Sequence, residues 1–222
     1  MKKILVVAPH PDDETLGLGG TLFKYNRKNY ELFWLIVTSM KNKDGFPDQK
    51  ILKREEEIEN IKKLYNFSEV FKLNLSPSKL DLIPMHELVK LIGEVFKKAM
   101  PEIVFIPNSS DIHSDHQIVH QASIACSKWF RFPSIKKLLS YETLSETDIF
   151  PNNTNVFCPN YFVDIDDSLD NKIEAMKIYE DEIADFPFPR SEEAIRSLAK
   201  VRGAASGFKA AEAFMLLKEI VS

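Results

Sequence analysis

Two short segments of the sequence concentrate side chains that could bind a metal ion or exchange protons. The first, HPDDE, follows the apolar run ILVVA and contributes His10, Asp12, Asp13 and Glu14. The second, DIHSDHQIVH, contributes Asp111, His113, Asp115, His116 and His120. This second segment holds three of the five histidines in the chain. The question is which chemistry an imidazole beside several carboxylates would serve.

Each segment taken alone has a structural explanation. In HPDDE, acidic residues favour the positive end of a helix dipole, and proline fits a helix entry. In the second segment, Ser114 or Asp115 can cap the helix that follows. A helix start accounts for one or two acids, but not for His10 or for a second cluster of similar composition. Together the segments offer imidazole and carboxylate ligands, and catalytic zinc uses three protein ligands with a fourth position open to water.

The pattern of apolar runs predicts the elements that position these segments. Short runs rich in β-branched or aromatic residues predict parallel strands buried on both faces, at KILVVA, ELFWLIVTS, EVFKLNL and EIVFIPN. Apolar residues at helical spacing predict covering helices over residues 15–28, 49–65 and 85–99. Further along, we expect helices over residues 115–130, 170–182 and 192–205, and strands at KKLLSYE and NYFVDI.

This alternation predicts an α/β fold: a doubly wound, mostly parallel, Rossmann-like sheet with helices on both faces and a less regular C-terminal part. In open sheets of this kind, ligands bind beyond the carboxyl ends of the strands. HPDDE follows the first predicted strand, the histidine-rich segment follows the fourth, and these two strands can be neighbours. We therefore expect the two clusters to meet at one end of the sheet.

The composition predicts one globular domain over residues 1–222. The chain is 44% hydrophobic and 28% charged, which suffices for one sizeable core. Its net charge of −4 gives no broad attraction for a polyanion, so we expect no nucleic-acid partner. No segment approaches the roughly 20 apolar residues of a membrane span. A first apolar run too short for a signal peptide and two distant cysteines, Cys126 and Cys158, predict a cytoplasmic protein with reduced thiols; a homo-oligomer is compatible with the sequence.

The two segments resemble the motifs of the LmbE/PIG-L family of zinc-dependent N-deacetylases, which act mainly on substrates that contain N-acetylglucosamine. The motifs stand here as PHPDDE at residues 9–14 and HSDH at residues 113–116. The similarity continues with an RxxE pair at Arg54 and Glu57 and with RGAASGFKAAEAF near the end of the chain. It therefore spans nearly the whole sequence.

The resemblance implies a metal centre and a base at matching positions. His10, Asp13 and His116 would be the zinc ligands. Asp12 would be the general base that takes a proton from the zinc-bound water, because zinc lowers the pKa of water from about 16 towards 7. Two imidazoles and a carboxylate with open positions also suit Fe(II), so the cofactor is predicted as zinc with iron as an alternative.

Four further residues receive roles around this centre. His113 would stabilise the oxyanion, either protonated or as a hydrogen-bond donor. Asp115 would hold one nitrogen of an imidazole and so fix its tautomer, while Glu14 would lie behind the ligands or at the helix start. Arg54 would reach the substrate's hydroxyls or a phosphate, although its acidic neighbours equally suit a surface helix with ion pairs.

Other residues have simpler explanations. His120 lies four residues after His116, but the glutamate of an HExxH motif is absent, so we expect a packed or capping histidine. His86 stands alone in a helical segment and is expected at the surface. The glycines of the segment LGLGG do not form a G-x-G-x-x-G dinucleotide motif, and they are better explained by close packing of a helix on the sheet.

The combined prediction is a metal-dependent hydrolase that removes an N-acetyl group from an amino sugar or sugar conjugate. The alternatives are a zinc hydrolase of another small amide and a metal-binding protein of this fold without catalysis. Ser114 stands where many relatives carry proline, and the predicted loops at residues 151–155 and 186–189 match no family motif. Because specificity resides in such loops, the sequence leaves the particular sugar open.

Overall fold

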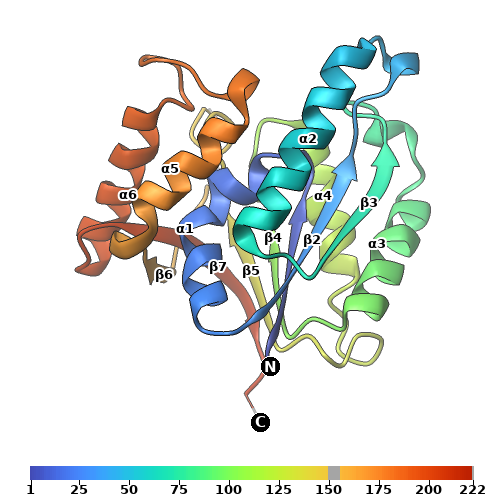
Figure 1. Cartoon of the computed structure of the whole chain (residues 1–222). Helices are drawn as coiled ribbons and strands as arrows, with labels where there is room; N and C mark the ends of the chain where they lie inside the picture. The colour runs from blue at the N-terminus through green and yellow to red at the C-terminus, as the bar shows by residue number, and fades with distance from the viewer. Residues whose placement is uncertain (150–155, 222) are drawn as a thin grey trace.

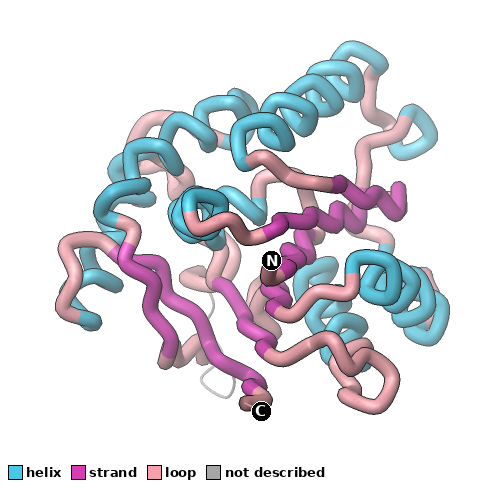
Figure 2. The backbone as a smooth tube through the Cα atoms, turned by 60° about the horizontal axis from the view of Figure 1, so that its bottom comes forward, coloured by secondary structure: helices cyan, strands magenta, loops and turns pink. Residues whose placement is uncertain are grey.

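The computed structural model describes residues 1–149 and 156–221, so the predicted loop at residues 151–155 lies outside the described residues. Within this part of the chain, a seven-stranded sheet forms the centre of the molecule (Figures 1 and 2), with strand order β3-β2-β1-β4-β5-β7-β6. Its strands are β1 (Lys3–Ala8), β2 (Glu31–Thr38), β3 (Glu69–Leu75), β4 (Ile103–Ile106), β5 (Lys137–Tyr141), β6 (Tyr161–Asp164) and β7 (Ala211–Glu219). The first five are parallel to one another, and β7 runs antiparallel to both β5 and β6.

Helices cover both faces of this sheet (Figure 1). They are α1 (Asp13–Arg27), α2 (Asp48–Tyr65), α3 (Met85–Ala99), α4 (Ser114–Ala125), α5 (Leu169–Ile178) and α6 (Glu192–Ser206). Side chains of α1, α2, α5 and α6 join one apolar core, and side chains of α3 and α4 join the other. The α/β class and the mostly parallel sheet predicted from the sequence are therefore confirmed.

Strand β1 is covered on both faces, which explains why its sequence is apolar without interruption. Ile4 and Val6 point into the core under α1 and α2, whereas Leu5 and Val7 point into the core under α3 and α4. All four side chains are fully buried. Alternate residues of a strand face opposite sides, so a strand covered on both faces needs apolar residues at every position.

The pairing of β1 with β4 brings the two polar segments together. The strands are parallel, with Ile4 opposite Ile103 and Val6 opposite Phe105. Their carboxyl ends therefore lie side by side, and the loops that follow them, residues 9–12 and 107–113, leave the sheet at the same end. The expected meeting of the two clusters is confirmed.

The glycines at the start of α1 allow close packing, as the sequence predicted. A Cβ atom on Gly17 would overlap the ring of Tyr141 on β5. A Cβ atom on Gly20 would lie 2.8 Å from the Cβ atom of Ile165. Both contacts are too short for an ordinary side chain, so glycine is required where this helix crosses the sheet.

Two helices were predicted too long, and one strand was missed. The helix expected over residues 115–130 ends at Ala125, because Trp129 and Phe130 are exposed and offer no buried face to continue it. The helix expected over residues 170–182 ends at Ile178 and is followed by a separate 3-10 turn, Glu180–Glu182. Strand β7 was not predicted, because AEAF begins with small and charged residues that give no strong strand pattern.

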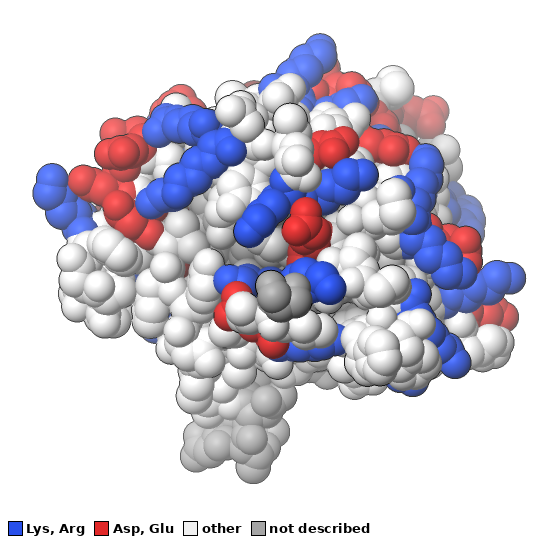
Figure 3. Space-filling view, turned by 90° about the horizontal axis from the view of Figure 1, so that it is seen from below, with Lys and Arg blue, Asp and Glu red and all other residues white. Residues whose placement is uncertain are grey.

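The described surface carries charges of both signs. On the face shown in Figure 3, acidic and basic side chains are interspersed rather than gathered into one basic area. Among the described residues, the helices are all too short or too polar to cross a bilayer.

Candidate active site

Three side chains from the two loops converge on one point. His10 lies in the loop after β1, Asp13 is the first residue of α1, and His116 lies in the first turn of α4. The Nδ1 atom of His10 lies 3.3 Å from Nε2 of His116. Asp13 completes the triangle, with Oδ1 3.3 Å from His116 Nε2 and Oδ2 3.5 Å from His10 Nδ1.

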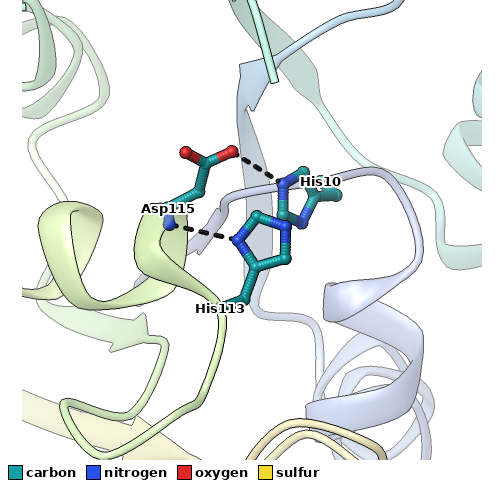
Figure 4. A group of neighbouring side chains, drawn as sticks. All are labelled: His10, His113 and Asp115. Carbon is teal, nitrogen blue, oxygen red and sulfur yellow. Dashed lines mark hydrogen bonds and ion pairs between the residues drawn. The ribbon is translucent and has the colours of Figure 1, made fainter. Parts of the chain in front are cut away.

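A carboxylate holds the far nitrogen of each imidazole. Asp115 Oδ2 lies 3.1 Å from His10 Nε2 (Figure 4). Asp111 Oδ2 lies 2.8 Å from His116 Nδ1. Each carboxylate favours a proton on the nitrogen that it contacts, so the lone pairs of His10 Nδ1 and His116 Nε2 face each other. This pairing of imidazole with carboxylate is the usual support for metal-binding histidines.

These separations fit a four-coordinate metal ion. Two ligand atoms about 2.1 Å from a tetrahedral ion lie about 3.4 Å apart, close to the three distances within the His10, Asp13 and His116 group. The group His10, His113 and Asp115 is also compact. In that group, however, His113 Nδ1 accepts the Asp115 N–H at 3.1 Å and Asp115 Oδ2 lies 3.1 Å from His10 Nε2, so its members already bond to one another. The spacing of ligand atoms therefore favours His10, Asp13 and His116 as the group that could hold a metal.

Without a metal, the same cluster takes up protons. Burial opposes protonation of His10, but its contacts with Asp115 and Asp13 outweigh burial and raise its pKa to about 9. The pKa of His116 is likewise raised against burial, mainly by Asp13 and Asp111. Burial opposes ionisation of Asp13, yet His116 and His10 hold the pKa of this carboxyl well below its ordinary value. A divalent cation bound by the triad would take the place of the positive charge that protonated His10 and His116 carry.

Asp12 lies beside the ligands without joining them. Its backbone has φ 131° and ψ −30°, a conformation that side-chain-bearing residues rarely adopt. Such strain costs about 1–3 kcal/mol and concentrates at functional sites. Glu14 supports this turn by accepting the Asp12 N–H at 3.1 Å, and it is fully buried against Tyr179, whose hydroxyl donates to it at 2.9 Å. Glu14 thus lies at the helix start, one of the two places predicted for it, and supports the turn that holds Asp12.

His113 caps α4, so the expectation that Ser114 or Asp115 is the capping residue is wrong. The backbone N–H of Asp115 donates to His113 Nδ1 at 3.1 Å (Figure 4). This acceptor role leaves the proton of a neutral ring on Nε2. Burial and the neighbouring His10 and His116 lower the pKa of His113 to about 4. Of the two roles considered for His113, a neutral hydrogen-bond donor therefore agrees better with its surroundings than a protonated imidazole.

Arg54 is buried, so the alternative of a surface arginine is wrong. Only 6% of the residue is exposed. Its guanidinium donates to the Pro11 carbonyl at 2.7 Å and contacts Glu57 at 2.9 Å and Glu182 at 2.6 Å. The first of these bonds fixes the backbone of the HPDDE loop. Contact of Arg54 with a substrate stays a prediction.

A cavity of about 280 Å³ opens above this cluster. Its lining includes the ligands, Asp12, His113 and Arg54. The remaining lining residues, which the sequence did not indicate, are Pro11, Thr38, Ser39, Met40, Phe46, Pro77, Thr143, Glu146, Glu182 and Arg190. The volume is just below the range for ligand pockets, about 300–1,000 Å³, and suits one sugar ring better than a long chain.

Several functional neighbours were missed by sequence reasoning. Asp111 was visible in the histidine-rich segment but received no role, because its contact with His116 depends on the turn between them. Arg190 follows the FPFP segment, and no local pattern connects it with Asp12. Neither His86 nor His120 belongs to a potential metal group of the described residues. His86 is exposed, and His120 Nδ1 lies 2.9 Å from the Pro107 carbonyl oxygen, as expected for a packed histidine.

The fold and the site define a class: an α/β protein with a cluster of two histidines and an aspartate, able to hold a metal ion, at the carboxyl end of its sheet. Comparison with known proteins agrees with this class. The GlcNAc-PI de-N-acetylase (PIG-L) family profile matches residues 5–127. The chain belongs to this family.

Individual relatives extend the similarity beyond the matched region. Diacetylchitobiose deacetylase of Thermococcus kodakarensis is 27% identical over 224 residues, covering 96% of this chain and 82% of that protein. An Escherichia coli (strain K12) protein named "Uncharacterized deacetylase YaiS" is 29% identical over 150 residues, covering 65% of this chain and 75% of that protein. The structure of N,N'-diacetylchitobiose deacetylase from Pyrococcus horikoshii superposes with a TM-score of 0.79 at 22% identity, covering 98% of this chain and 84% of that one.

Proposed function

We propose that this protein is a zinc-dependent deacetylase that hydrolyses the N-acetyl group of an amino sugar or sugar conjugate. One observation carries the proposal: a triad of ligand atoms with tetrahedral spacing and an uncoordinated carboxylate, Asp12, line the same cavity. A protein that only bound metal would need the triad but not Asp12. Family membership and the named activities of the relatives support deacetylation as the reaction.

His10, Asp13 and His116 hold the metal in this proposal. When bound, zinc supplies Lewis acidity at the amide carbonyl and makes water easier to deprotonate. Asp12 takes the proton from the attacking water and later returns it to the leaving amine. Asp12 lines the same cavity as the triad, next to Asp13 in the chain, and its Oδ2 atom lies 3.2 Å from Nη1 of Arg190.

His113 stabilises the oxygen of the former carbonyl. Its Nε2–H is the free donor of the ring, because Nδ1 is occupied by the Asp115 N–H. Stabilising the negative charge that develops on this oxygen is commonly worth 10²–10³ in rate. Asp115 acts through its neighbours: its carboxylate orients His10 and its backbone orients His113.

Two variants test the reaction and the metal site separately. Asp12→Asn keeps the shape of the side chain and the three ligands, so it should retain zinc while kcat falls by roughly 10²–10⁴. His116→Ala removes a ligand and should lose both zinc and activity. Zinc is quantified by mass spectrometry, and acetate release is followed on a panel of N-acetylated sugars.

The control is Asp81→Asn, an exposed acid outside the cavity, which should change neither readout. Full acetate release by the zinc-loaded Asp12→Asn enzyme would show that another group is the base. Release of acetate from simple amides but not from sugars would favour the alternative hydrolase. Zinc binding without turnover of any amide would favour the metal-binding protein.

A further inference from the structure

Glu146 brings a carboxylate into the active-site cavity from the segment after β5. Its backbone is fixed at both ends: its N–H donates to the Thr143 carbonyl at 3.1 Å, and its carbonyl accepts the Ile112 N–H at 3.1 Å. The next residue, Thr147, donates its hydroxyl to Asp111 at 2.5 Å. Asp111 in turn contacts the ligand His116. The position of Glu146 is therefore tied to the metal site through a short chain of bonds.

The side chain of Glu146 differs from the other acids of the cavity. Asp12 contacts Arg190, Glu182 contacts both Arg54 and Arg190, and Asp13 contacts the two ligand histidines. Within residues 1–149 and 156–221, the Glu146 carboxylate has no hydrogen-bond or ion-pair partner. Glu146 is therefore a half-buried hydrogen-bond acceptor on a fixed backbone. This arrangement is expected of a side chain that binds a ligand.

The net charge of the cavity limits which kind of ligand Glu146 could bind. Its lining contains four carboxylates, on Asp12, Asp13, Glu146 and Glu182, and two guanidinium groups, on Arg54 and Arg190. Both guanidinium groups are already bound to carboxylates, and the remaining Nε–H of Arg190 is itself buried. With His10 and His116 neutral as ligands, a divalent metal would balance the excess of two negative charges. Both arginines of the described lining are engaged by carboxylates, and Glu146 is an acid that neither of them contacts.

We propose that Glu146 determines specificity by accepting hydrogen bonds from hydroxyls of an uncharged sugar ring and by repelling a phosphate or carboxylate at the same place. The inference rests on the proposed deacetylase function and narrows its substrate class to neutral amino-sugar derivatives. Selection of this kind combines an attractive contact for one ligand with a repulsive one for its competitor.

The test compares binding and turnover on the zinc-loaded full chain. Binding of glucosamine and of its 6-phosphate and 1-phosphate is measured by calorimetry for the wild type and for Glu146→Gln. The wild type should bind unphosphorylated glucosamine at least about tenfold more tightly than either phosphate. In Glu146→Gln the ratio of the two affinities should fall to about one. The amide no longer repels the phosphate, and its oxygen accepts hydrogen bonds from sugar hydroxyls more weakly than the carboxylate. Asp148→Asn, an exposed acid two residues away, should keep the wild-type preference.

Acetate release from N-acetylglucosamine and the matching phosphates gives the second readout. The ratio of kcat/KM for neutral and phosphorylated substrates should follow the binding preference, with zinc content unchanged. An unchanged preference in Glu146→Gln, in binding or in turnover, would overturn the role of Glu146. Loss of the preference in binding while no variant releases acetate would support Glu146 and overturn the deacetylase proposal, so the two failures are distinct.

Discussion

Arg190 Nη1 lies 3.2 Å from Asp12 Oδ2, although 178 residues separate the two in the chain. The second terminal nitrogen of Arg190 contacts Glu182 at 3.2 Å, and the ring of Phe188 lies 5.5 Å below the guanidinium. The FPFP segment, which had no assigned role, therefore places the Arg190 guanidinium beside Asp12, the candidate base. Burial and the neighbouring Asp13 and Glu182 raise the pKa of Asp12, while Arg190 and Arg54 lower it.

Replacing Arg190 should change how activity depends on pH. Asp12 acts as a base only when ionised, so activity rises as the pH passes its pKa. Arg190→Met removes a cation that lowers this pKa, so the acid limb of the kcat/KM profile should move to higher pH. A shift of about one pH unit would cost up to roughly tenfold on the acid limb of the profile and little on its plateau. The profile is measured between pH 5 and 9 on protein of verified zinc content.

A conservative variant separates charge from packing. Arg190→Lys should restore part of the shift, because it returns the charge without the two-pronged contact. Arg196→Met, an arginine paired with Asp170 and Glu192 outside the cavity, is the control. An equal loss of activity at every pH would mean that Arg190 supports only the fold.

Metal affinity should itself rise with pH. In the metal-free protein the pKa of His10 is raised to about 9, so below that pH a cation must displace at least one proton. Up to about pH 9 the apparent affinity should therefore increase about tenfold per pH unit for each proton displaced. Competition against a chelator of known pH dependence measures this slope. An apparent metal affinity that did not change between pH 7 and 9 would contradict the raised pKa of His10.

Asp111→Asn should weaken metal binding without removing a ligand. Asp111 Oδ2 holds His116 Nδ1 and its Oδ1 accepts from Thr147, so the amide would keep the shape but lose the charge that orients and polarises the imidazole. Loss of such a partner typically costs 10–100-fold in metal affinity. The zinc dissociation constants of Asp111→Asn, of Asp148→Asn as control and of the wild type are compared at one pH. Equal constants would remove Asp111 from the site.

The sequence could predict the parts of this site that are local. His10, Asp12 and Asp13 follow one buried strand, His113 and His116 follow its neighbour, and the rule for parallel sheets places both groups together. Glu146 and Arg190 could not be placed this way. Each reaches the cavity from an irregular segment whose path is set by packing, and neither stands in a recognisable spacing to another site residue.

A similar long-range contact supports the first helix. Helix α1 is broken at Leu18, where φ is −149°, and Glu212 of β7 enters the break. Its carboxylate accepts the N–H groups of Gly20 at 3.0 Å and Thr21 at 2.7 Å. Lys172 of α5 pairs with Glu212 at 2.7 Å and donates to the Leu16 carbonyl at 2.7 Å. The Glu212 carboxylate thus lies at the start of the second part of α1, and the Lys172 ammonium lies at the end of the first part. The helix dipole favours both placements.

Lys172→Met should therefore destabilise the fold strongly. Lys172 and Glu212 are each only 5% exposed, and removal of one partner of a buried pair costs about 3–5 kcal/mol because the other charge is left uncompensated. Adding Glu212→Gln should recover part of the loss, since the amide is neutral and its oxygen still accepts an N–H from α1. Urea unfolding of the single variants, the double variant and the exposed control Lys177→Met gives the coupling energy; the control should stay within about 0.5 kcal/mol of the wild type. If the double variant lost the sum of both single effects, the two side chains would not act as a pair, and the break in α1 would need another explanation.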